Sequence, residues 1–110
     1  MSTEHAQAAS PYHEAWDFIF RHSTSGGSYR MAKLVLSLYN GDEYPFSLGE
    51  CLLGLDSNNE RIALEIVAYY MKHRENDALR EIGEKIFKHY PYLSEVAEVM
   101  YNARQEFNRR

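Results

Sequence analysis

The chain has one cysteine, three prolines and no long apolar run. A single cysteine, Cys51, cannot form an internal disulfide, so a reducing compartment is expected. Every apolar segment, including the one at residues 34–39, is far shorter than the roughly 20 residues of a membrane-spanning helix. Residues 1–10 are small and polar and do not resemble a signal peptide. These absences predict a soluble, cytoplasmic protein.

Lysine and arginine are missing from residues 40–60, although this stretch contains several acidic side chains. The whole chain has a formal net charge of −4. General nucleic-acid and membrane binders usually carry a basic surface that attracts phosphate groups. We therefore expect neither nucleic acid nor a membrane as a partner. The acidic residues of the stretch are Asp42, Glu43, Glu50, Asp56 and Glu60.

The alternation of apolar and polar residues that marks a β-strand is also absent over any useful length. Apolar residues instead recur every three or four positions, as on one face of a helix. The pattern predicts an all-α fold: a bundle of five or six short helices in a single domain, residues 10–110, after a flexible tail at residues 1–9. The predicted inward faces contain Tyr12, Trp16, Ile19 and Phe20; Met31, Leu34, Val35 and Leu38; Ile62, Ile66, Val67, Tyr70 and Met71; Leu79, Ile82, Ile86 and Phe87; and Val96, Ala97, Met100, Ala103 and Phe107.

Capping residues set the expected helix boundaries. Ser10 followed by Pro11 is typical of a helix start, and Ser28 is expected to cap the second helix. Ser47 and Ser57 each have a glutamate three residues later, which is the capping-box pattern. The other expected starts are Asn76 or Asp77 and about Ser94, and the expected ends are Asn40-Gly41, Gly54, Arg74 and Tyr90.

Patterns for catalysis or metal binding are weak. His13 and Asp17 are four residues apart, which places both on one face of a helix. A zinc site needs at least three protein ligands, however, and the sequence identifies no third one. Cys51 lies among leucines and is expected to be a buried structural thiol. We therefore predict no enzyme activity, no metal site and no cofactor.

A loop rich in glycine and hydroxyl groups precedes the second expected helix. Backbone N–H groups at a helix N-terminus can bind an anion, so this loop is a candidate anion site. The phosphate-loop pattern that ends in Gly-Lys-Ser/Thr is absent, and a flexible connector with a capping serine is the favoured interpretation. The candidate residues are Ser25, Gly26, Gly27, Ser28 and Arg30.

The corner at residues 40–46 combines a turn signal with acids and aromatics. Tyrosine is among the residues that most often anchor protein interfaces. Tyr44 follows Asp42 and Glu43, and we expect these three side chains to be exposed and to form a partner-binding surface. Phe46 is expected to point inward and to close the end of the bundle.

Residues 47–74 suggest an alternative function, because they resemble a helix-turn-helix in outline, with Gly54 in the turn. Asn58 and Asn59 stand near the start of the second helix, where such proteins read bases. The neighbouring Glu60 would repel phosphate groups, and phosphate neutralisation supplies much of the affinity for DNA. A nucleic-acid-binding regulator is therefore the second choice.

Four motifs stand between residues 26 and 56: Gly-Gly-x-x-Arg at residues 26–30, Leu-Ser-Leu-Tyr-Asn-Gly-Asp at 36–42, Tyr-Pro-Phe-x-Leu at 44–48 and Leu-Asp at 55–56. Through these motifs, the span from Gly26 to about Tyr70 resembles a family of short uncharacterised proteins found in proteobacteria, often on plasmids and prophages. The resemblance implies no activity, but it favours an accessory role on a mobile element. Taken together, the sequence predicts a non-enzymatic protein, monomer or homodimer, that binds an unidentified protein partner.

Overall fold

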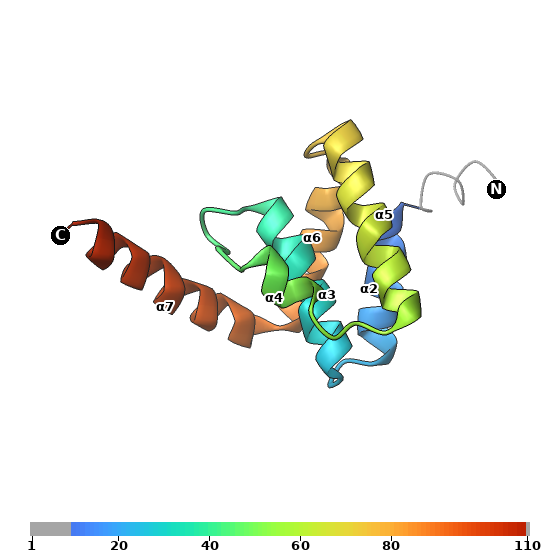
Figure 1. Cartoon of the computed structure of the whole chain (residues 1–110), viewed down its shortest axis with the longest axis horizontal. Coiled ribbons are helices and arrows are strands. Elements are labelled where there is room, and N and C mark those ends of the chain that lie inside the picture. The colour runs from blue at the N-terminus through green and yellow to red at the C-terminus, as the bar shows by residue number, and fades with distance from the viewer. Residues whose placement is uncertain (1–9, 110) are drawn as a thin grey trace.

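Six α-helices and no strand are found in residues 10–109, which are the residues that the computed structural model describes (Figure 1). The predicted all-α bundle is therefore confirmed, whereas the tail predicted at residues 1–9 lies outside the described residues. The helices are α2 (Pro11–Arg21), α3 (Gly26–Tyr39), α4 (Leu48–Leu52), α5 (Ser57–His73), α6 (Asp77–His89) and α7 (Pro91–Asn108).

Helix α3 lies at the centre of the bundle and packs against α2, α4, α5 and α6. Its sequence explains this position, because apolar residues cover most of its circumference. Met31, Leu34, Val35 and Leu36 are all at most 1% exposed. Helix α2 lies between α5 and α6 and contacts both. The core of the protein is thus organised around one broad apolar helix.

Helix α7 projects from this body (Figure 1). It packs mainly against α6, from which it is separated only by Tyr90. Its projection makes the molecule elongated, with principal dimensions of 54 × 26 × 24 Å. Leu93 and Ala97 in its first turns are buried, whereas every described residue from 101 onward is exposed. The distal half of α7 therefore lies outside the core.

Three predicted helix caps are confirmed. The side chains of Ser10, Ser47 and Asn76 each accept a hydrogen bond from the backbone N–H three residues later. These bonds satisfy N–H groups that have no partner within the helix.

Three other helix starts differ from prediction. Ser25 caps α3, because the Ser28 hydroxyl is buried and donates to the carbonyl oxygen of His22 at 2.5 Å. Asp56 caps α5 in place of Ser57, and its carboxylate accepts from the backbone N–H of Asn59. Helix α7 begins at Pro91 and not near Ser94, since proline fits the first helical position.

Several residues predicted to face inward are exposed. Met71 is 64% exposed in the last turn of α5, and Phe107 is 73% exposed near the end of α7. Both residues follow the apolar periodicity of their helices. Each lies, however, in a part of its helix that extends beyond the neighbouring helices. Phe20 and Phe87 lie at the edges of their apolar faces and are also exposed.

Helices α3 and α6 approach closely at Gly83, a buried residue on α6. A Cβ atom at this position would lie 2.7 Å from Cγ of Tyr39 and 3.0 Å from its Cδ1 and Cδ2 atoms. The tyrosine hydroxyl is held by a 2.6 Å hydrogen bond that it donates to Glu84. The ring therefore fills the space that any larger residue at position 83 would need.

We predict that Gly83→Ala lowers the free energy of unfolding by about 1–2 kcal/mol, because the cost of overpacking a core, usually about 1–3 kcal/mol, exceeds the gain in helix preference. Alanine favours helix formation by only about 1 kcal/mol relative to glycine, so the steric term decides the sign. Chemical denaturation measures the change. Gly49→Ala on α4 is the matched control and should be neutral or stabilising, because a Cβ atom there would lie 3.8 Å from the Ser47 hydroxyl oxygen, an ordinary van der Waals distance. Equal stability gains in both variants would contradict the prediction.

Candidate functional site

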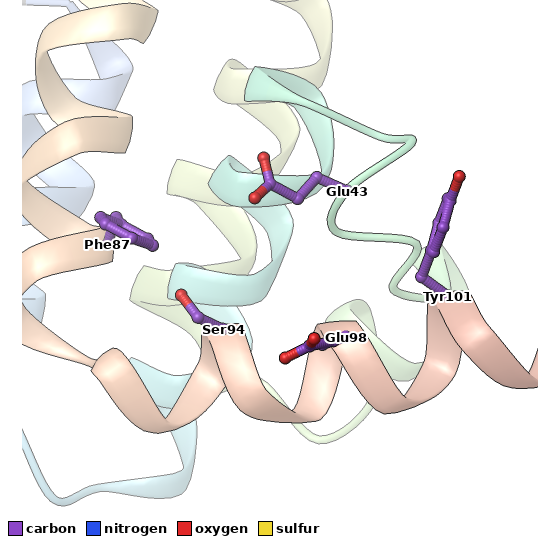
Figure 2. Close-up of a pocket in the computed structure, with 5 residues that line it drawn as sticks. All are labelled: Glu43, Phe87, Ser94, Glu98 and Tyr101. Atoms are coloured by element: carbon purple, nitrogen blue, oxygen red, sulfur yellow. The ribbon is translucent and has the colours of Figure 1, made fainter.

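A groove of about 500 Å³ lies between the corner at residues 40–46 and the first half of α7. Three segments of the chain supply its lining: the corner, the end of α6 and α7 (Figure 2). Glu43 comes from the corner and Phe87 from α6. Three further residues come from α7, and their spacing of four and three residues places them on one face of that helix. The α7 residues are Ser94, Glu98 and Tyr101.

Backbone hydrogen bonds shape the corner above the groove. The Asn40 side-chain oxygen accepts from the backbone N–H of Glu43 at 3.1 Å, and its carbonyl oxygen accepts from that of Tyr44 at 2.8 Å. The backbone N–H of Phe46 donates to the Tyr44 carbonyl oxygen at 2.8 Å. This compact turn leaves Asp42 and Glu43 exposed and directs the next side chain inward.

The expected exposure of Tyr44 was wrong, because its side chain is only 2% exposed. Its ring stacks on Phe46 with centroids 6.3 Å apart and meets the ring of Phe87 edge-on at 6.4 Å. Its hydroxyl lies 3.5 Å from that of Ser94, and burial raises its pKa. Phe46 is 8% exposed, which confirms its predicted inward position. Tyr44 therefore joins the corner to α6 and α7 and is not itself a contact residue.

The groove combines carboxylates with aromatic surface. Glu43 and Glu98 supply two negative charges, while Phe87 and Tyr101 are 40% and 41% exposed. None of the lining residues is a cysteine, histidine or lysine. Its chemistry suits the binding of a basic and apolar group.

Cys51 lies elsewhere, in α4, and is 1% exposed. Burial raises the pKa of this thiol to about 11, and the nearby positive charge of Lys33 only partly opposes the shift. The thiolate is the nucleophilic form of cysteine, so burial and the raised pKa both disfavour a nucleophilic role for Cys51. The prediction of a buried structural thiol is confirmed.

The predicted anion-binding residues lie together at the N-terminus of α3, but their hydroxyl groups are engaged. Ser25 caps the helix and donates to the Ser28 hydroxyl at 2.9 Å. The Arg30 guanidinium lies beside Gly54 and within 3.3 Å of the position of a Cβ on Gly26. Gly27 approaches the buried Asn59 side chain. The anion site remains a prediction that no bound group tests.

His13 and Asp17, considered as a pair of metal ligands, contact different partners. His13 is 2.7 Å from the Ser10 hydroxyl through Nδ1 and 3.5 Å from Glu81 through Nε2. Asp17 forms an ion pair with Arg21 at 2.9 Å. Within residues 10–109, no group of three or more histidine, cysteine, aspartate or glutamate side chains is arranged to hold a metal ion.

The segment considered as a helix-turn-helix has a different arrangement. Helix α4 packs against α3, whereas α5 packs against α2 and α3. Asn59, expected to read bases, is 2% exposed because it faces the core at the start of α5. Asp56 and Glu60 remain exposed at the same helix end. Asn58, the other candidate, is exposed, and its side-chain oxygen accepts a hydrogen bond from Arg61 at 3.2 Å. The arrangement therefore lacks the helix pairing of such a motif, and one of its two candidate amides is buried.

Sequence reasoning missed the α7 wall of the groove. Ser94, Glu98 and Tyr101 recur at helical spacing, so their common face was visible in the sequence. Their position opposite Glu43 was not, since it depends on how α7 leaves α6.

A family model, described as a family of unknown function (DUF7673), matches residues 18–91, more than half of the 110-residue chain. Glu43 and Phe87 lie inside this span, whereas nearly all of α7 follows it. No curated protein and no solved structure matches the chain. In the part of the chain that the structure describes, no helix is long and apolar enough to cross a membrane. The chain belongs to the DUF7673 family, whose function is unknown.

Proposed function

We propose that this protein acts by binding another protein, without catalysis, and that the groove beside α7 is its contact surface. The observation that carries this proposal is the exposure of two large rings, Phe87 and Tyr101, within one concave surface. Exposed apolar surface in a groove with a polar rim is typical of protein interaction sites. Tyrosine and other aromatic residues supply many of the anchors in such interfaces.

The charges of the groove indicate the kind of partner. Glu43 and Glu98 flank the apolar surface, and the adjoining Asp42 is exposed. A partner segment with an apolar side chain next to lysine or arginine fits both features. Complementary charges at the rim of an interface chiefly raise the association rate and the specificity. Two of the three residues predicted for partner binding, Asp42 and Glu43, thus keep that role in the proposal.

The setting of this interaction follows from the sequence alone. The absence of a membrane-spanning pattern and of paired cysteines supports a cytoplasmic protein. The motifs at residues 26–56 resemble those of plasmid and prophage proteins, which supports a role as an accessory factor of a mobile element. The buried position of Asn59 and the exposed carboxylates of Asp56 and Glu60 at the start of α5 disfavour the alternative of nucleic-acid binding through residues 47–74.

Site-specific photo-cross-linking in cells of the native host tests the proposal. The photoreactive residue p-benzoylphenylalanine replaces Tyr101 in the groove or, as the control, Leu64 on α5, which is 69% exposed. We expect a discrete protein adduct at position 101 and none at position 64. Mass spectrometry then identifies the partner.

A charge reversal in the groove shows whether the adduct depends on it. Glu98→Lys should reduce the yield of the adduct by about fivefold or more, since it places a positive charge against the basic residue expected on the partner, and such like-charge contacts cost more than about 1 kcal/mol. Glu60→Lys changes the net charge equally at an exposed site on α5 and should leave the yield unchanged. An absent adduct, or one that both variants leave intact, would reject the groove as the contact surface.

A further inference from the structure

Helix α7 carries a second exposed apolar surface, separate from the groove. Tyr92 is 66% exposed, Val99 68% and Phe107 73%. Val96 is half-buried and Ala103 is exposed. These five residues recur every three or four positions, so they form one continuous stripe along the helix, which we call the α7 stripe.

The α7 stripe and the groove lie on different sides of the helix. At about 100° per residue, the buried Leu93 and Ala97 face the body between these two sides. Ser94 and Glu98 lie on one side of this buried face and Val99 on the other. A protein bound along the α7 stripe would therefore leave the groove open.

We propose that the α7 stripe pairs with the α7 stripe of a second copy of this chain, with the two helices antiparallel. In the register centred on residues 99 and 100, Tyr92 faces Phe107 of the second copy and Val96 faces its Ala103. The two Val99 side chains meet at the twofold axis. At the two ends of the interface a large residue of one copy then opposes a large residue of the other, and smaller residues lie in the middle. The same stripe on the two copies is therefore complementary.

The charge distribution selects the antiparallel orientation. Residues 91–99 contain Glu95 and Glu98 and no basic side chain. Residues 100–109 contain Arg104 and Arg109 against Glu106. Arg109 forms an ion pair with Glu106 at 3.2 Å, whereas Arg104 has no ion pair within residues 10–109. The antiparallel arrangement places the acidic half of each helix along the basic half of the other.

A parallel pair would instead place the two acidic halves together, which is unfavourable for closely spaced charges. The antiparallel pair also covers the exposed ring of Phe107, which the body of one chain leaves in solvent. Because each helix of 18 residues is about 27 Å long, the interface is small. Association in the micromolar range is expected for an interface of this class.

Sedimentation equilibrium of the full chain from about 1 to 500 μM tests the pairing. The mass should rise from 12.9 kDa to twice that value with concentration. Val99→Glu should weaken the association at least tenfold, because it places two carboxylates at the twofold axis. Leu64→Glu is the matched control on α5, with 69% exposure against 68% for Val99, and should leave association unchanged. Unchanged circular dichroism shows that both variants remain folded.

Disulfide trapping tests the orientation, since the native Cys51 is buried and protected. Val99→Cys should form a covalent dimer on mild oxidation, because the two positions face each other at the axis. Ala103→Cys should not, because its two copies lie about seven residues, or about 10 Å, apart along an antiparallel pair.

A monomeric mass at 500 μM would overturn the proposal, as would a dimer that Val99→Glu leaves unchanged. Efficient trapping through Ala103→Cys would overturn the antiparallel arrangement. None of these results bears on the groove, whose partner is tested separately by cross-linking at position 101.

Discussion

Tyr44→Ala is expected to lower the free energy of unfolding by about 3–5 kcal/mol, the usual cost of truncating a buried aromatic residue. The Tyr44 side chain is 2% exposed and contacts the rings of Phe46 and Phe87. Removal of its ring leaves a cavity between the corner and α6, and exposes the remaining rings to water. The midpoint of chemical denaturation should fall accordingly, with an unchanged denaturant slope.

Two controls separate the contribution of the ring from that of its surroundings. Tyr44→Phe keeps the ring and removes only a hydroxyl that lies 3.5 Å from Ser94, so it should cost less than about 1.5 kcal/mol. Asp42→Ala changes an exposed neighbour and should shift stability by less than about 0.5 kcal/mol. A Tyr44→Ala protein as stable as the wild type would show that this corner does not support the body.

The tight turn at this corner explains why Tyr44 was wrongly predicted to be exposed. Two acids precede it, and sequence neighbours of charged residues are commonly exposed. The backbone N–H groups of Glu43 and Tyr44 both donate to Asn40, and this turn is so tight that Glu43 points to solvent and Tyr44 into the core. The composition of a short stretch predicts one exposure for all of its residues, whereas a tight turn can expose one residue and bury the next.

Helix periodicity predicted the number and class of the helices well, because a face of a helix is a local property. Which of two candidate residues caps a helix, in contrast, depends on contacts outside that helix or on the reach of the side chain. Ser25 and Ser28 both suit the start of α3, and the contact of Ser28 with the His22 carbonyl decides between them. Asp56 and Ser57 compete in the same way at the start of α5, where the carboxylate of Asp56 reaches the N–H of Asn59.

Burial along α7 could not be predicted from its own residues. Leu93 and Phe107 follow the same apolar periodicity, yet one is 3% exposed and the other 73%. The difference arises because α7 extends beyond the body (Figure 1). For the same reason the groove was hidden, since Glu43, Phe87 and Tyr101 come from three separate segments.

The second large effect is expected at Leu34, in the middle of the central helix. Leu34→Ala should lower the free energy of unfolding by about 2–5 kcal/mol, through lost burial and the cavity that remains. Helix α3 contacts four other helices, and Leu34 is 1% exposed. A neighbouring helix cannot move into the cavity without losing contacts elsewhere along α3, so we expect a value in the upper half of this range.

Leu64→Ala provides the matched control, because the same atoms are removed from a side chain that is 69% exposed. Its effect should stay within about 0.5 kcal/mol. Both substitutions replace leucine by alanine within a helix, so side-chain chemistry and helix propensity change equally. The difference between the two changes in the free energy of unfolding therefore reports the effect of burial. If both variants unfold at the same denaturant concentration, α3 is not the centre of the core.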